Sequence, residues 1–339
     1  MTLDRVLLIQ LQQLGDVLLS SVLLEDLRQA LPSARIDYLT RAKPAQLLQN
    51  NPHLSEVVLY DADHPLRMMG LVRRRRYDAI VDPQSNPRSA QLVLTSGAAR
   101  RTGFAISGPW KLVYSETAPR ETDPGEGVVR ERQRLVELLG LPVTPRPPRL
   151  YLSSAEREQG RIDAAALGTA PGAPRVGLVL SAGSAPSVWP VDRFAELATR
   201  LQRESIAPVV VRTFGDEAEV ARFESVTTGV PRADAPEIRR FLGLLSVLDL
   251  VVCANSGPAH FAMALGVPTV TLYGPTHARH WSPDLPIAGV VSSPRLHCVA
   301  CARGEKRTAA GHTCMLEITV DAVHERVRAL LAAAPRTKP

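Results

Sequence analysis

The sequence is poor in several residue types, and each shortage excludes a class of protein. Only 4% of its 339 residues are aromatic, and it has four cysteines. Four cysteines are too few for a disulfide scaffold, and their spacing fits a reducing compartment. No uninterrupted apolar run reaches the roughly 20 residues that a membrane-spanning helix needs. No internal repeat with a period of roughly 20 to 50 residues occurs, which excludes solenoids and propellers.

The first residues, MTLDRVLLIQLQQLGDVLLSSVLL, lack the features of a signal peptide. They have no charged leading region, no continuous apolar core and no small-residue cleavage site. The pattern instead indicates a first strand followed by a helix. We therefore expect a cytoplasmic protein.

Lysine is scarce as well, so the net charge of +6 rests almost wholly on arginine. Arginine favours planar, two-point contacts with phosphate or carboxylate, which predicts an anionic partner. A GC-rich genome produces the same bias with no function attached. We expect no nucleic-acid partner.

Short apolar runs alternate with amphipathic stretches along the chain, which is the pattern of βα units around a parallel sheet. The proline-dense stretch PVTPRPPRLY at 142–151 cannot continue a helix and predicts an interdomain linker. Residues 319–333 have the apolar spacing of a terminal helix. Strands are expected near 5–11, 35–40, 56–60, 77–82, 99–104 and 111–115, and after the linker near 175–181, 207–213, 248–253 and 268–273.

The length fits two domains of roughly 150 residues each. We predict an N-terminal domain at 1–150, a C-terminal domain at 151–318, and a helix at 319–333 that packs back across the junction. Two doubly wound α/β domains would place a ligand site at the strand ends that face the cleft between them. The run RRRRY at 73–77 most simply ends a helix, where cations interact favourably with the dipole; a membrane-surface role is the alternative.

The loop in QLQQLGDVLLSS, residues 10–21, carries the first candidate group. A strand ends near Leu11, Gly15 permits a tight turn, and Asp16 stands at or near the start of a helix. One interpretation of Asp16 is an N-cap aspartate. The other is a carboxylate that projects into the cleft from the strand edge and acts as a general base.

A second loop, in LVLSAGSAPSVWPVDRF, runs from a strand into Gly183 and Ser184 and enters a helix after Trp189 and Pro190. Small and hydroxyl residues at a strand end suit a phosphate-bearing ligand. The next strand ends in RTFGDEAE. The charged residues at this strand end are Arg212, Asp216, Glu217 and Glu219. The acidic side chains would accept hydrogen bonds from ribose hydroxyls or interact favourably with the dipole of the following helix.

The stretch NSGPAHFAMALG, residues 255–266, follows the predicted strand LDLVVC. A turn rich in backbone N–H groups, a serine hydroxyl and the positive end of a helix form an anion site, most naturally for a diphosphate. His260 would lie one turn into the helix and is interpreted as a ligand contact, although a structural role suits it too. The residues of this candidate site are Asn255, Ser256, Gly257, Pro258, His260 and, at the end of the following strand, Thr276.

A cysteine cluster stands near the C-terminus. Cys298, Cys301 and Cys314 supply three thiols, and His297 or His312 offers a fourth ligand. This set fits a tetrahedral structural zinc or iron site, and reduced thiols in a loop are the alternative.

The chain resembles the ADP-heptose heptosyltransferases of glycosyltransferase family 9, which include the lipopolysaccharide heptosyltransferases. The resemblance covers nearly the whole length. It rests on LGDVLLSSVLLEDLRQALPSARIDYLT at 14–40 with NP at 51–52, on SAGSAPSVWPVDRFAELATRL at 181–201, and on NSGPAHFAMALGVPTVTLYGPTHARHWSP at 255–283. It implies a GT-B fold with the acceptor on the first Rossmann-like domain and the nucleotide sugar on the second.

The resemblance also implies a reaction. Family members transfer heptose from ADP-heptose, with inversion and without a catalytic metal, to a phosphorylated lipid-linked inner core or, in a smaller branch, to protein side chains. Asp16 matches the aspartate that is thought to deprotonate the acceptor hydroxyl. The iron-carrying branch that modifies autotransporter adhesins has a similar cysteine cluster. The family's diphosphate-binding segment matches Ser256, Gly257 and His260, and its ribose-contacting region matches Glu217 or Glu219.

Two positions depart from the family pattern. Ser187 stands where a lysine usually meets the donor phosphates, and Asn255 stands where an aspartate usually precedes Ser-Gly. We hypothesise that Arg212 or Arg279 supplies the missing positive charge, because a departing ADP needs charge stabilisation.

Three alternatives remain at this stage. The chain would modify protein side chains, would bind a nucleotide sugar without catalysis, or would be a GT-B-like transferase or epimerase for another nucleotide sugar such as a UDP-hexose. A glycolipid acceptor would place the protein peripherally at the inner membrane face.

Overall fold

The computed structural model describes residues 3–120, 126–183, 187–213, 215–293 and 314–333. The chain divides into two compact units, Met1–Tyr151 and Leu152–Pro339, called unit 1 and unit 2 below. Residues 141–153, which include the proline-dense stretch, form no helix or strand. Among the described residues, no helix is both long and apolar enough to cross a membrane.

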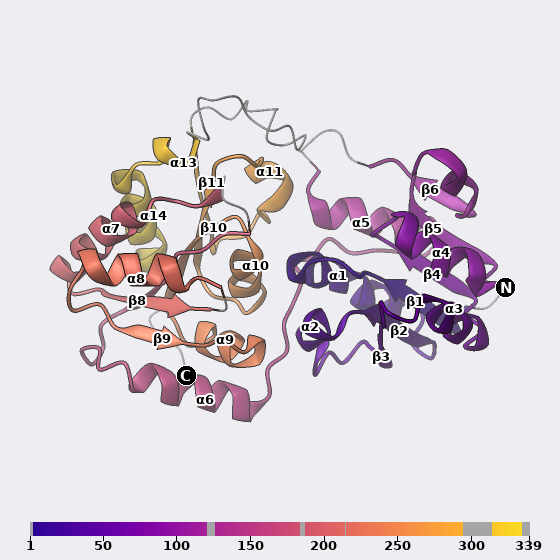
Figure 1. Cartoon of the computed structure of the whole chain (residues 1–339), viewed down its shortest axis with the longest axis horizontal. Helices are drawn as coiled ribbons and strands as arrows, with labels where there is room; N and C mark the ends of the chain where they lie inside the picture. Colours follow the sequence, from indigo (N-terminus) through magenta and orange to yellow (C-terminus); the bar gives the residue numbers. More distant parts are fainter. Residues whose placement is uncertain (1–2, 121–125, 184–186, 214, 294–313, 334–339) are drawn as a thin grey trace. The chain divides into compact units, whose positions relative to one another are not determined.

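Unit 1 is built on a parallel sheet whose described strands run in the order β3-β2-β1-β4-β5-β6 (Figure 1). The strands are β1 (Arg5–Ile9), β2 (Arg35–Thr40), β3 (Glu56–Leu59), β4 (Ala79–Asp82), β5 (Arg100–Phe104) and β6 (Glu116–Ala118). The helices are α1 (Leu14–Ala30), α2 (Ala42–Ala45), α3 (Pro65–Arg74), α4 (Pro87–Ser96) and α5 (Val128–Glu137), with 3-10 turns η1 (Gln46–Leu48) and η2 (Gly108–Leu112).

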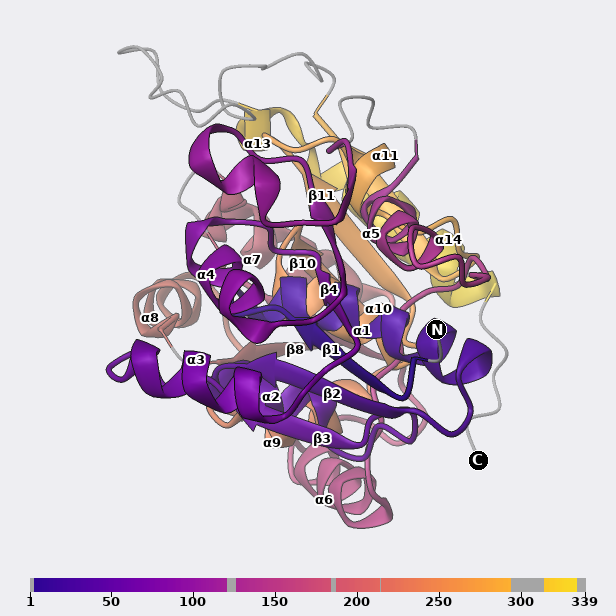
Figure 2. The same cartoon turned by 90° about the vertical axis from the view of Figure 1, so that its right-hand side faces the viewer.

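Both faces of this sheet are buried, because its side chains alternate between two apolar layers. In β1, Val6 and Leu8 pack beneath α1 and α5, whereas Leu7 and Ile9 pack beneath α3 and α4. Figure 2 shows the pair α3 and α4 beside each other. The doubly wound α/β arrangement predicted from the sequence is thereby confirmed for unit 1.

Unit 2 repeats this architecture with described strands in the order β12-β11-β10-β7-β8-β9, all parallel. They are β7 (Arg175–Val179), β8 (Ala207–Arg212), β9 (Arg232–Asp234), β10 (Leu250–Ala254), β11 (Thr269–Tyr273) and β12 (Ala288–Ser292). The helices are α6 (Ser154–Ala165), α7 (Val191–Arg203), α8 (Glu217–Val226), α9 (Ile238–Leu245), α10 (Gly257–Ala264), α11 (Ala278–Trp281), α13 (Cys314–Glu317) and α14 (Val320–Ala333).

The helices α7, α8 and α14 share one apolar layer of unit 2 with every second residue of β7 and β10. Helix α10 packs on β10 and β11 and contributes nothing to that layer, so it covers the opposite face. The terminal helix α14 contacts α7, β10, β11 and β12. Its expected packing across the domain junction stays a prediction.

The sequence-based prediction was wrong at one strand and missed three others. Residues 111–115 do not form a strand: η2 occupies Gly108–Leu112, and Val113 and Tyr114 are apolar because they fill the core under α4. Strands β6, β9 and β12 were missed because they lie at the sheet edges, where their side chains carry no strong apolar pattern.

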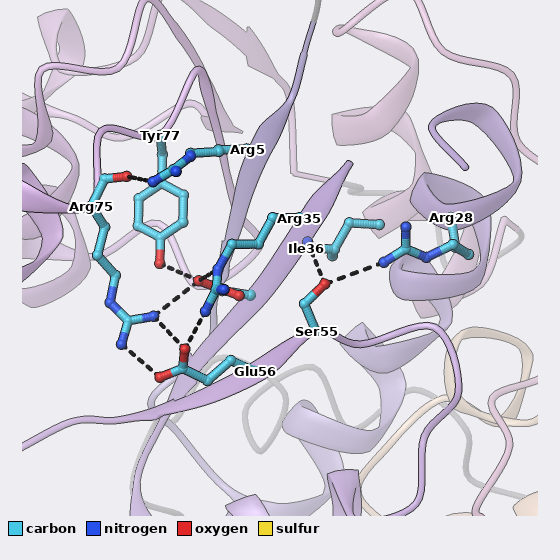
Figure 3. Close-up of polar contacts among 9 residues, drawn as sticks. Arg5, Arg28, Arg35, Ile36, Ser55, Glu56, Arg75 and Tyr77 are labelled. Carbon is cyan, nitrogen blue, oxygen red and sulfur yellow. Dashed lines mark hydrogen bonds and ion pairs between the residues drawn. The ribbon is translucent and has the colours of Figure 1, made fainter. Parts of the chain in front are cut away.

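The run RRRRY at 73–77 has a structural role that the sequence did not reveal. Helix α3 does end at Arg74, but Arg75 then joins a polar cluster at the N-terminal edge of the sheet (Figure 3). Its guanidinium contacts Asp37 Oδ2 at 3.0 Å and Glu56 Oε1 at 2.6 Å, and Tyr77 donates its hydroxyl to Asp37 Oδ2 at 2.8 Å. The hydrogen bond from Arg75 holds the pKa of Glu56 below its usual value. Arg75 therefore ties β2 and β3 together.

Two glycines set the spacing between α6 and α9. A Cβ on Gly160 would overlap the carbonyl oxygen of Gly243, and a Cβ on Gly243 would lie 2.6 Å from the carbonyl oxygen of Glu156. Because these neighbours are backbone atoms, neither contact is relieved by a rotamer change.

We expect Gly160→Ala to lower the free energy of unfolding by about 1–3 kcal/mol, as overpacking typically does. Gly70→Ala in α3 is the matched control, since its new Cβ would meet only the flexible end of Arg74 and alanine favours a helix by about 1 kcal/mol over glycine. Chemical denaturation measures both. Equal stabilisation of the two variants would contradict the close packing of α6 on α9.

Candidate functional site

The loops that carry the predicted donor residues meet at one edge of unit 2. In a parallel sheet, the C-terminal ends of neighbouring strands lie at the same edge, and ligands bind where the strand order reverses. In unit 2 the reversal falls between β7 and β10. The segments that follow these two strands, 180–183 and 255–258, therefore flank the switch point, with those after β8 and β11 on either side.

A hydrogen bond fixes the ends of β10 and β11 to each other. Asn255 donates its side-chain amide to Thr276 Oγ1 at 2.8 Å, and its backbone N–H bonds to Leu272 O at 3.0 Å. The other side-chain atom of Asn255, Oδ1, is buried and has no partner among the described residues. A buried acceptor of this kind is costly unless something donates to it.

The N-terminus of α10 is free of side-chain capping. Ser256 is the N-cap residue, but its side chain makes no cap hydrogen bond and its hydroxyl instead contacts Ala254 O at 3.3 Å. Pro258 occupies the first turn, where its missing N–H costs nothing. The first N–H groups of a helix have no intrahelical partner and attract anions, so this turn has the chemistry of a phosphate seat.

His260 lies one turn into α10 and is 6% exposed. Its ring centre is 6.1 Å from that of Trp281 in α11. The imidazole is thus largely enclosed by the fold, and its predicted contact with a ligand stays a prediction.

Arg212, at the end of β8, already forms ion pairs with acidic side chains. Arg212 donates to Asp234 Oδ1 at 2.6 Å, and its guanidinium lies 3.8 Å from Glu217. This pairing with Asp234 raises the pKa of Arg212. Asp216 is fully buried and accepts hydrogen bonds from Thr213, so it fixes the loop and is not available to a ribose. Glu217 is 60% exposed in the first turn of α8.

Of the two arginines proposed to replace the missing lysine, Arg279 is the less committed. It is exposed in α11, close in sequence to Thr276, and it has no ion pair within the described part of the chain. Ser187 is 9% exposed and stands two residues before Trp189, whose indole donates to Ile318 O. Gly183 is exposed with open space around it, and Ser184 lies outside the described residues.

The cysteine cluster is described at one position only. Cys298, Cys301 and His312 lie outside the described residues, as does His297. Cys314 is 3% exposed, and its Sγ would be 3.2 Å from a Cβ on Gly274, at the turn that ends β11. Across the ranges that are described, no three histidine, cysteine or acidic side chains come together as a metal site. The fourth cysteine, Cys253, is buried in β10, and burial raises its pKa to about 12.

The candidate base of unit 1 stands inside a helix, not at its cap. Helix α1 begins at Leu14 with Gln13 as its N-cap residue, so the N-cap interpretation of Asp16 is wrong. Gly15 and Asp16 form its first turn, after the C-terminal end of β1. This end of β1 adjoins β4, where the strand order of the sheet reverses.

An arginine far away in the sequence holds the Asp16 carboxylate. Arg132 of α5 donates to Asp16 Oδ1 at 2.6 Å, to Asp16 O at 2.7 Å and to Ser20 Oγ at 3.0 Å. The side chain of Arg132 is 7% exposed and that of Asp16 is 24% exposed. Asp16 Oδ2 accepts no hydrogen bond from the residues that the structure describes. The carboxylate is thus fixed on one oxygen and open on the other.

A buried network braces this edge at the end of β4. Gln84 Oε1 accepts the backbone N–H of Leu11 at 2.6 Å, which ties the segment after β4 to the segment after β1. Asp82 accepts the Tyr114 hydroxyl at 2.6 Å and the N–H groups of Gln84 and Ser85. Complete burial raises the pKa of the Asp82 carboxyl. The segment before Asp16 is therefore held by polar contacts from both strands.

Sequence reasoning missed Arg132, Gln84 and Asp82. Arg132 and Asp16 are 116 residues apart, and no local spacing connects them. The one available signal was a single arginine on the apolar side of the pattern VVRERQRLVELL, where a cation needs a buried partner.

Comparison with known proteins identifies the family and the fold. Residues 66–311 match the family model for glycosyltransferase family 9 (heptosyltransferase). Lipopolysaccharide heptosyltransferase 2 of Escherichia coli K12 is 24% identical over an alignment that covers 96% of this chain and 98% of that protein.

Solved structures share the fold at low identity. The glycosyltransferase family 9 protein of Veillonella parvula superposes with a TM-score of 0.85 and 20% identity, covering 98% of this chain and 99% of that one. Escherichia coli heptosyltransferase WaaC with ADP gives 0.73 and 18%, covering 96% and 99%. The iron-containing dodecameric glycosyltransferase TibC of enterotoxigenic E. coli gives 0.61 and 15%, covering 97% and 76%. The chain has the GT-B fold of these proteins and belongs to glycosyltransferase family 9, the heptosyltransferases.

Proposed function

We propose that this glycosyltransferase transfers heptose from ADP-heptose, with inversion, to a hydroxyl of a phosphorylated, lipid-linked inner-core acceptor. Unit 1 binds the acceptor and unit 2 the nucleotide sugar, and the reaction takes place at the cytoplasmic face of the inner membrane. The relatives named lipopolysaccharide heptosyltransferases support the sugar and the acceptor class. The ADP-bound WaaC structure, which has the same fold, supports the nucleotide.

The observation that carries this proposal is the half-open carboxylate of Asp16. Inversion requires the acceptor hydroxyl to attack the anomeric carbon from the side opposite the diphosphate, and the hydroxyl must lose its proton as the new bond forms. Oδ2 of Asp16 accepts that proton, while Arg132 holds Oδ1. A protein that only bound nucleotide sugars would not need such a base.

The leaving ADP takes the electrons of the broken glycosidic bond and gains negative charge. The uncapped first turn of α10 offers N–H groups and a positive dipole end to the diphosphate. Arg279 adds a cation, and the unpaired Oδ1 of Asn255 accepts a hydrogen bond from the ligand or from a water bound with it. Because residue 187 is serine, the N–H groups of α10 and the guanidinium of Arg279 take the place of the usual lysine.

A protein acceptor is the second candidate function. The observation in its favour is the cysteine cluster, because the iron-containing transferase TibC shares the fold and Cys314 lies against the Gly274 turn at the end of β11. We propose a structural zinc or iron at Cys298, Cys301, Cys314 and His312, with no part in catalysis.

Asp16→Asn tests the base. We expect the amide to accept a hydrogen bond but no proton, so that turnover of ADP-heptose with acceptor falls by about 10²- to 10⁴-fold. The affinity for ADP-heptose, measured by calorimetry, should stay unchanged because Asp16 does not belong to unit 2. A near-normal turnover number would refute the assignment.

Arg132→Met tests the positioning of that base. We expect kcat to fall by about 10²-fold, the cost of a misplaced catalytic group, with the KM for ADP-heptose unchanged. In an Asp16→Asn background the same substitution should cost little more, because the two residues act as a unit. The control is Arg130→Met on the same helix, since the partly buried Arg130 pairs with Glu126 and Glu137 and not with Asp16.

Circular dichroism and the melting temperature show whether Arg132→Met folds. If the Arg132 and Asp16 substitutions multiply in the double variant, Arg132 does not act through Asp16 and the positioning role is wrong.

A further inference from the structure

Helices α3 and α4 and the turn η2 form one outer layer of unit 1. All three pack onto the same apolar core beneath them, through Met68 and Val72 of α3, Leu92 and Val93 of α4, and Trp110 of η2. Figures 1 and 2 show α3 beside α4 in this layer. Their solvent sides therefore belong to one surface, called the α3–α4–η2 face. Its projecting side chains are Leu66, Arg67, Arg74, Leu94, Lys111 and Leu112.

Three leucines on this face project into solvent. Leu66 is 80% exposed, Leu94 is 60% exposed and Leu112 is 81% exposed. Each comes from a different element, so one leucine stands on each member of the layer. Because these side chains are not buried in the core, core packing does not explain why leucine stands at these positions.

The cations on the same face are not neutralised. Arg67, Arg74 and Lys111 are exposed and form no ion pair with any residue that the structure describes. Other exposed arginines of the chain do pair with carboxylates, as Arg222, Arg232 and Arg240 show in unit 2. The α3–α4–η2 face therefore carries unpaired positive charge.

The basic and apolar groups are interleaved, not segregated. Arg73 of α3 reaches the left-handed turn at Gly97 that ends α4, where its Cζ would lie 3.1 Å from a Cβ. This contact brings the basic end of α3 to within one turn of Leu94. Isolated leucines among long cationic side chains suit a surface on which apolar groups enter a shallow hydrocarbon layer while cations stay at the phosphates.

We propose that the α3–α4–η2 face binds a bilayer surface that contains anionic phospholipid. The charge complementarity selects this partner: unpaired cations face lipid phosphates, and Leu66, Leu94 and Leu112 enter the acyl boundary beside them. The partly buried Trp110 belongs to η2, the same element as Leu112, and amphipathic aromatic rings such as tryptophan favour membrane interfaces. The lipid-linked acceptor of the proposed function gives this contact its purpose, but the contact itself needs no substrate.

Vesicle co-sedimentation tests the proposal with the full chain and no substrates. We expect binding to phosphatidylcholine vesicles with about one third phosphatidylglycerol, and weak binding to pure phosphatidylcholine. Each basic residue near an anionic surface contributes about fivefold in affinity, so Arg67→Gln with Arg74→Gln should weaken binding about 25-fold. Leu66→Ser with Leu112→Ser should weaken it as well, including at high salt.

Two control pairs on unit 2 match these changes. Arg157→Gln with Arg203→Gln removes two exposed arginines that have no ion pair among the described residues, and Ile162→Ser with Val226→Ser removes two apolar side chains that are 54% and 52% exposed. Both control proteins should bind like the unmodified chain. The proposal is overturned if the unmodified chain ignores anionic vesicles, or if the controls lose as much affinity as the test variants.

A de-acylated, soluble acceptor separates this proposal from the proposed function. The arginine and leucine variants should keep full turnover on it. Loss of turnover there would place these residues in acceptor binding and contradict a membrane role, whereas a failure of the unmodified chain to turn over any heptosyl acceptor would leave the vesicle result unaffected.

Discussion

The ion pair between Arg132 and Asp16 is the contact on which the proposed chemistry depends. A carboxylate at the start of a helix ordinarily stabilises that helix, either by capping its first N–H groups or by interacting with the positive end of its dipole. Here the buried guanidinium of α5 takes one oxygen and leaves the other open at the strand edge. Helices α1 and α5 must therefore pack in one fixed relation, which their shared apolar layer provides.

The proposed reaction places a different constraint on unit 2, which would have to hold a diphosphate without the usual lysine. The fold supplies backbone N–H groups at α10, ties Asn255 to Thr276, and keeps Arg212 occupied with Asp234. Serine at 187 and asparagine at 255 change the local charge in opposite senses relative to the family pattern. In the proposed site, the N–H groups of α10 and the guanidinium of Arg279 therefore take the place of the lysine.

Much of the fold and of the candidate site could be predicted from the sequence, because the patterns that indicate them lie within short segments. Strands such as β1 (RVLLI) and β10 (LVVCA) are almost continuous apolar runs between turn residues, and the motif Asn-Ser-Gly-Pro predicts the start of α10. The contacts that complete the site are not local: Arg132 reaches Asp16 from 116 residues away, and Gln84 reaches Leu11. Val113 and Tyr114 misled the strand prediction because core packing and strand formation favour the same residue types.

Calorimetric titration of the full chain with ADP, UDP and GDP tests the central claim most directly. The claim is that the switch-point edge of unit 2 seats the diphosphate of an adenine nucleotide. We predict that ADP binds at least about tenfold more tightly than UDP or GDP, a difference of about 1.4 kcal/mol. Thr276→Val, which removes the hydrogen bond that orients Asn255, should weaken ADP binding. Equal affinity for the three nucleotides, or binding of none, would contradict the account.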